Sequence, residues 1–146
     1  MKTQTRRRVG TVAGTAILAA SAGVLTSTDA ALASADGCTK GPGTSIVCLV
    51  VRGSGLKVNA TEVALNQTIQ AWSGICSYSA NWNATYKSGA PVSKVVGPKS
   101  HCSTWRAWLG WNPHTDFKND SSFCGRFKAD VTGQAWTPSA CVKIKS

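Results

Sequence analysis

The sequence predicts an all-β protein, a small antiparallel β-sandwich or barrel held together by disulfides. Short segments alternate apolar with polar residues, turn residues separate these segments, and the six cysteines form an even set. No segment has the sustained 3.6-residue period of an amphipathic helix. Residues 61–72 are ambiguous and would also accommodate a turn or two of helix.

Residues 1–35 have the pattern of an export signal, and we exclude them from the fold. A basic start at Lys2 and Arg6–Arg8 precedes the apolar stretch Val9–Leu25, and small residues suitable for cleavage follow within Ala31–Ala35. Both the general and the twin-arginine export routes remain open. No other apolar run reaches the roughly 18 residues of a transmembrane helix. We therefore expect a secreted, extracellular protein.

The rest of the chain has the length of one small domain preceded by a short arm. Residues 36–45 are rich in Gly, Thr and Pro and show no apolar alternation. We expect this segment to be a flexible arm that becomes ordered on binding a partner. Residues 46–146 form the β-rich domain.

The first two strands of the domain are predicted on either side of a glycine-rich bend. Ile46–Val51 is a β-branched apolar run, typical of a strand buried on both faces. Gly53–Gly55 then bends or bulges the chain. The alternation resumes over 56–65, although its phase is disturbed at Thr61–Glu62.

The clearest alternation spans 76–86, where Tyr78, Trp82 and their neighbours at even positions point to one face and Ser, Asn and Thr residues to the other. Turn residues at 87–91 end this strand, and 92–96 can return as its partner.

Two later strands are predicted at 123–131 and 140–144. In the first strand Phe123 and Phe127 share the apolar face, and in both strands the cysteines lie on the opposite face. If the two strands form a hairpin, Cys124 and Cys141 can bridge it. Basic side chains share this outer face, namely Arg126, Lys128, Lys143 and Lys145.

Sequence alone does not decide how six cysteines pair. We expect sequential pairing: Cys38–Cys48, Cys76–Cys102 and Cys124–Cys141. Structural zinc is disfavoured because no Cys-x2-Cys pair is present and His101 and His114 have no ligand spacing. We expect no metal and no cofactor.

The segment Trp105–His114 contains three tryptophans at intervals of three residues. Trp105, Trp108 and Trp111 would form a stripe in a 3₁₀-like turn but would alternate between faces in an extended strand. Tryptophan is favoured at the centres of protein contacts, and it also stacks on sugars and bases. The alternative is that one or more of the three closes the core, and both interpretations remain open.

Charge and composition restrict the function. The net charge is +10, and it falls to +7 once the leader is removed with its four basic residues and Asp29. This surplus favours anionic partners without indicating a specific nucleic-acid site. His114 and Asp116 form the only close His–acid pair of the mature sequence, and no nucleophile motif accompanies them. We therefore expect a binding protein, not an enzyme.

The order of several short motifs resembles a group of small secreted actinobacterial proteins that includes the adaptor subunit of umbrella toxin particles. The motifs are Val51–Val58, Cys76 at the start of a Trp/Tyr strand, Gly97–Cys102, Phe123–Cys124 and Ala140–Val142. The resemblance implies a β-rich, non-enzymatic adaptor that joins a lectin subunit to a large repeat-bearing toxin used in antibacterial competition. It also implies that Asp36–Ser45 docks into a degenerate protease-like cleft of the lectin subunit.

These arguments give one set of candidate partner-binding residues. They are Asp36, Thr39, Lys40, Gly41, Pro42, Gly43, Trp105, Trp108, Trp111, Arg126, Lys128 and Lys143. Two other functions remain open. A loop between Cys102 and Cys124 could inhibit a protease, or the cationic hairpin and the tryptophans could bind bacterial walls or membranes.

Overall fold

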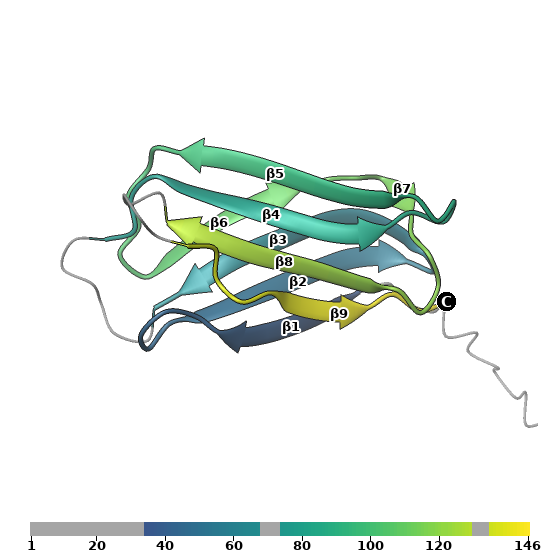
Figure 1. Cartoon of the computed structure of the whole chain (residues 1–146), viewed down its shortest axis with the longest axis horizontal. Coiled ribbons are helices and arrows are strands. Elements are labelled where there is room, and N and C mark those ends of the chain that lie inside the picture. Colours follow the sequence, from purple (N-terminus) through teal and green to yellow (C-terminus); the bar gives the residue numbers. More distant parts are fainter. Residues whose placement is uncertain (1–33, 68–73, 130–134) are drawn as a thin grey trace, which may run out of the picture.

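The computed structural model describes residues 34–67, 74–129 and 135–146, which form a two-layer antiparallel β-sandwich (Figure 1). The first sheet has the order β1-β2-β3-β6, with β7 paired to β3, and the second sheet has the order β5-β4-β8-β9. The predicted leader falls almost entirely outside the described residues, and so does much of the ambiguous segment 61–72. The part of the chain that is described contains no helix able to cross a membrane.

The strands have the following bounds: β1 Ala35–Lys40, β2 Ile46–Ser54, β3 Lys57–Asn66, β4 Tyr78–Thr85, β5 Pro91–Lys99, β6 Arg106–Trp111, β7 Thr115–Asp116, β8 Ser122–Ala129 and β9 Ala140–Lys143.

The core lies between the two sheets, where alternate residues of each strand are buried. On β2 the buried positions are Val47, Leu49 and Val51, whereas Ile46 on the other face is 40% exposed. The prediction that this strand is buried on both faces is therefore wrong. The physical reason is that only the inner face of an outer layer meets the other sheet.

A β-bulge explains the disturbed alternation of the second predicted strand. Arg52 pairs with Ala60 but Gly53 pairs with Val58, so Asn59 is an extra residue on β3. A side chain on Gly53 would lie 2.0 Å from the carbonyl oxygen of Lys57. Glycine is therefore required where the bulged strand approaches β2 most closely.

The second sheet confirms the sequence prediction closely. β4 pairs with β5, and β8 pairs with β9 as an antiparallel hairpin. Cys124 lies directly opposite Cys141, and all three disulfides follow the sequential pairing. Paired Cys side chains on the outer faces of neighbouring strands lock the register of those strands.

The segment 36–45 is not the flexible arm that the sequence suggested. Most of it forms β1, which pairs with β2 from Ala35 to Lys40, and the Cys38–Cys48 disulfide links directly opposite residues. The turn that follows is closed by backbone hydrogen bonds between Gly41 and Ser45 and between Ser45 and Pro42. The small side chains that suggested flexibility serve to bring β1 close to its neighbours.

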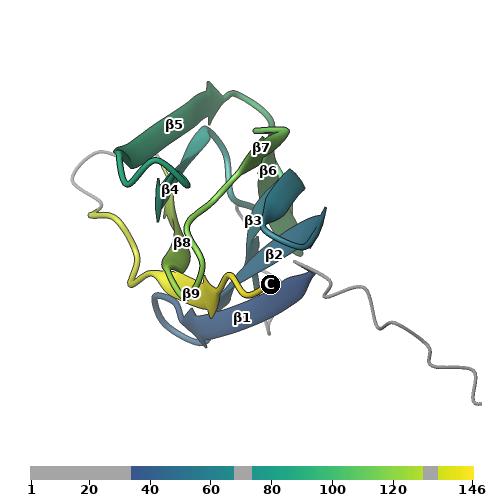
Figure 2. The same ribbon diagram turned by 90° about the vertical axis from the view of Figure 1, so that its right-hand side faces the viewer.

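β1 also closes one side of the sandwich, because it lies next to β9 of the other sheet (Figure 2). Gly37 is at the point of closest approach. A Cβ atom there would lie 2.6 Å from the carbonyl oxygen of Cys141 and 3.1 Å from Cγ1 of Val142. The two sheets can meet along this seam only because position 37 has no side chain.

We therefore expect Gly37→Ala to lower the free energy of unfolding by about 1–3 kcal/mol, because the added methyl group forces the backbones of β1 and β9 apart. Urea unfolding followed by tryptophan fluorescence measures this loss. Gly110→Ala is the matched control on the same sheet, since its Cβ would be 3.4 Å or more from any neighbour. Equal stability of both variants would contradict the close seam.

Candidate functional site

The tryptophan segment is extended over Arg106–Trp111, not a 3₁₀ turn, so its side chains alternate between faces. Trp111 points into the core with Ala107 and Leu109, and its ring lies 6.1 Å from those of Trp82 and Phe123. This confirms the interpretation that at least one tryptophan closes the sandwich. Trp108 points outward.

The other two tryptophans are on the surface. Trp105 is 55% exposed at the start of β6, and Trp108 is 47% exposed on the outer face of the first sheet. The ammonium group of Lys99 lies 5.2 Å from the centre of the Trp108 ring. Both side chains are therefore accessible to a binding partner.

Strand register defines the surroundings of Trp108. On the outer face Trp108 is opposite Ala64, and Gly110 is opposite Glu62. Arg106 on the same face donates a hydrogen bond to Glu62 and forms an ion pair with it. An aromatic ring, a carboxylate and two small residues are thus brought together from two strands 44 residues apart in sequence.

The predicted arm residues do not act as one surface. Gly41 and Pro42 line an apolar hollow of about 290 Å³ together with Trp136 and Pro138. Gly43 is exposed in the same turn. The other predicted arm residues belong to β1. Asp36 and Lys40 are exposed there, and Thr39 is half-buried.

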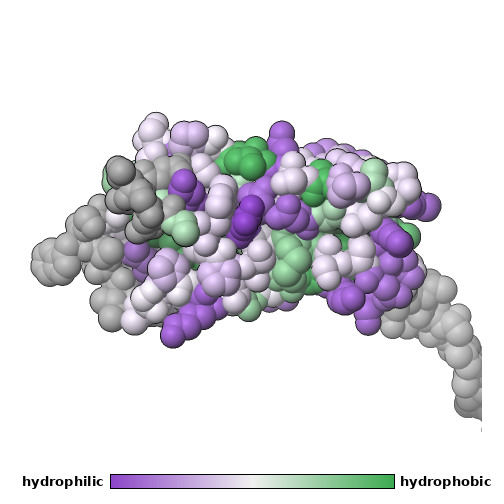
Figure 3. Space-filling view, in the orientation of Figure 1, coloured by the Kyte–Doolittle hydropathy of each residue, from purple (hydrophilic) through white to green (hydrophobic). Residues whose placement is uncertain are grey.

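The predicted basic face is divided in two. Lys128 lies near one end of β8, whereas Lys143 is opposite Ser122 at the other end. Six residues of strand separate these positions by about 20 Å. Figure 3 shows hydrophilic residues distributed over this side of the molecule, not gathered in one patch.

Arg126 has partners within the protein. Its Nε donates a hydrogen bond to Oδ1 of Asn81 at 3.0 Å, and its guanidinium lies 5.0 Å from the centre of the Trp136 ring. Asn81 is only 1% exposed and also donates to Oγ of Ser93. Arg126 therefore provides a hydrogen-bond donor for the buried side-chain amide of Asn81. The alternation pattern of the sequence did not indicate that Asn81 and Trp136 would contact Arg126.

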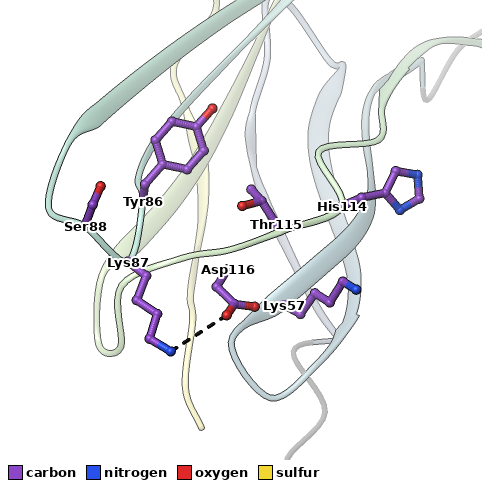
Figure 4. A pocket seen from close by; sticks show the side chains of 7 residues that line it. All are labelled: Lys57, Tyr86, Lys87, Ser88, His114, Thr115 and Asp116. Atoms are coloured by element: carbon purple, nitrogen blue, oxygen red, sulfur yellow. Dashed lines mark ion pairs between the residues drawn. The ribbon is translucent and has the colours of Figure 1, made fainter.

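The His–acid pair lies beside an open hollow of about 670 Å³ at the end of the sandwich that carries the β2–β3 and β4–β5 turns (Figure 4). The Asp116 carboxylate faces Lys87, with Nζ 3.8 Å from Oδ2. His114 has a positive φ of 49° and its ring points away from Asp116. The two side chains do not assemble as a catalytic pair.

The segment between Cys102 and Cys124 contains β6, β7 and the start of β8, and residues 112–114 and 117–121 connect these strands. Within the described residues, no group of three His, Cys, Asp or Glu side chains is placed to hold a metal ion.

Fold and disulfides define the class of the protein as a disulfide-stabilised antiparallel β-sandwich. Comparison with protein-family models, curated proteins and solved structures finds no match.

The different positions of the tryptophans predict different effects on stability. We expect Trp111→Ala to cost about 3 kcal/mol, because it removes a large ring from the aromatic cluster of the core. Trp105→Ala and Trp108→Ala should each cost about 1 kcal/mol or less, since these rings are on the surface. Chemical denaturation of the three variants measures the difference. A loss of about 3 kcal/mol on replacing Trp108 would contradict its surface position.

Proposed function

We propose that the protein is an exported, non-enzymatic adaptor that holds two other proteins together. The observation that carries this proposal is that the two ends of the sandwich differ in chemistry. At one end Pro42, Ile46 and Trp105 expose apolar surface beside Lys40 and Lys99, whereas the exposed side chains of the opposite end include Lys57, Lys87 and Lys118 beside Asp116. An adaptor needs two such separate surfaces so that both partners bind at the same time.

The aromatic end consists of Pro42, Ile46, Trp105 and Trp136. Pro42 and Ile46 flank the β1–β2 turn, and Trp105 is held beside the end of β3 because its carbonyl oxygen accepts a 2.9 Å hydrogen bond from the amide of Gln67. The apolar hollow beneath Pro42 and Trp136 could receive a side chain from a partner. Trp105 at this end is 55% exposed, and exposed tryptophans are typical of the residues that dominate binding energy.

The lysine end consists of Lys57, Lys87 and Lys118, all of which are exposed. Backbone contacts hold them together, since Lys57 is opposite Asp116 and the amide of Lys87 donates to the Asp116 carbonyl oxygen. Lys118 in turn donates from its backbone amide to Thr85 at the end of β4. This end suits an acidic protein surface, because opposite charges accelerate encounter and fix orientation.

The scaffold keeps both ends in place. Three disulfides join strands within the sheets and the segments that flank them. A rigid scaffold loses little conformational entropy on binding, so more of the contact energy appears as affinity. The disulfides also indicate an oxidising environment, which agrees with the export signal predicted for the leader.

The resemblance of the sequence to the adaptor subunit of umbrella toxin particles suggests which two proteins the partners are. The partners would be a lectin subunit and a repeat-bearing toxin of an antibacterial complex. Because 36–40 is a paired strand, docking of this region would use the turn at Gly41–Ser45 and the aromatic end, not a free arm.

Affinity purification of the tagged, secreted protein under native conditions tests the proposal. We expect two different proteins to be recovered with it from the culture medium of the bacterium that secretes it. Mass spectrometry should identify one partner with lectin repeats and one large partner with internal repeats. Recovery of the chain alone would exclude the adaptor function.

Variants of each end make the test specific. The double variant Pro42→Ala and Trp105→Ala should lose one partner, and the triple variant Lys57→Glu, Lys87→Glu and Lys118→Glu should lose the other. Matched controls on β5 are Val95→Ala and Lys94→Glu, which alter an exposed apolar residue and an exposed lysine away from both ends. Loss of both partners from either control, or retention of both by the end variants, would count against two separate surfaces.

A further inference from the structure

The outer face of the first sheet contains a groove that belongs to neither end. It has a volume of about 340 Å³, within the lower range of small-molecule sites. β2, β3 and β6 contribute its lining, which includes Arg52, Ala60, Glu62, Trp108, Gly110 and Asn112. The groove is independent of the adaptor proposal, because it lies on a sheet face and not on the loops of either end.

Small residues create the groove between larger ones. Gly110 has no side chain and Ala60 has only a methyl group, so the sheet surface is low at these positions. The Trp108 ring extends along β6 towards Gly110, where its Cζ3 would lie 3.9 Å from an added Cβ. The exposed ring therefore borders a depression with a flat floor of backbone.

Polar groups of both kinds surround this depression. Glu62 offers carboxylate oxygens as acceptors, and its orientation is fixed by the ion pair with Arg106. Arg52 and Asn112 are exposed, and within the described residues their side chains have no hydrogen-bond partner. Donors and an acceptor thus lie around one aromatic ring.

We propose that this groove binds a pyranose unit of a β-linked glycan. A pyranose with equatorial hydroxyls has a face of axial C–H groups that packs on an indole ring, while its hydroxyls are both donors and acceptors. Such hydroxyls match a lining that holds Glu62 together with Arg52 and Asn112. The Glu62 carboxylate is already paired with Arg106, so Arg52 and Asn112 remain as donors for sugar hydroxyls.

Titration of the ¹⁵N-labelled protein with trisaccharides of β-linked glucose, N-acetylglucosamine and xylose tests the proposal. The six tryptophans give six indole N–H signals, and the signal missing from Trp108→Ala identifies that of Trp108. We expect at least one trisaccharide to shift the Trp108 signal saturably. The dissociation constant should be on the order of 1 mM, because a single small sugar site gains little binding energy.

Two variants and one control decide the outcome. Trp108→Ala should weaken binding by about tenfold or more, and Gly110→Ala should weaken it while leaving the ring in place, because the methyl group raises the floor. Val95→Ala, which shortens an exposed apolar side chain on β5 outside the groove, should leave affinity unchanged. Absence of a saturable shift with all three sugars, or equal affinity of Trp108→Ala and the unaltered protein, overturns the proposal. Loss of partner proteins from Gly110→Ala with no sugar shift would assign the groove to a protein contact instead.

Discussion

Packing of the half-buried Trp111 against the aromatic core determines which residues the first sheet presents to solvent. Its ring packs with Trp82, Phe117 and Phe123 between the sheets. Because successive strand residues point to opposite faces, Trp111 can be inside only if Trp108 and Gly110 are outside. A shift of β6 by one residue would expose three core side chains and bury Arg106. The core therefore fixes the aromatic wall and the floor of the groove.

The bulge at Asn59 likewise determines which residues of β3 face the core and which face solvent. Val58 faces the core, and in a regular strand Ala60 and Glu62 would face it as well. An unpaired carboxylate in the core would be costly. The extra residue reverses the phase, so Thr61, Val63 and Leu65 are buried and Glu62 reaches the outer face, where Arg106 pairs with it. One irregularity thus resolves a conflict in the sequence and supplies the groove with its acid.

Strands whose apolar residues alternate could be predicted from sequence, and so could the cysteine bridge that their phase implies. β1 could not, because its inward residues are Ala35, Gly37 and Thr39, which resemble a linker. They are small because the backbone of β9 approaches β1 at Gly37. The atom that requires a glycine at position 37 is the carbonyl oxygen of Cys141, which is 104 residues away in sequence. Contacts such as Arg126 with Trp136, and the assembly of the groove from three strands, likewise depend on pairing that no local period reveals.

β6 connects the three surfaces and explains how they are spaced. It begins beside Trp105 at the aromatic end and carries Trp108 and Gly110 in the groove, and the chain then leads through His114 to β7 at the lysine end. Strand pairing with β3 and burial of Trp111 prevent β6 from sliding, since any odd shift would invert its faces. Ligands on these surfaces would therefore be held at constant separations. Such an arrangement suits a rigid spacer between partners. A ligand changes a protein's conformation only by favouring an alternative state, and the core packing allows β6 no alternative register.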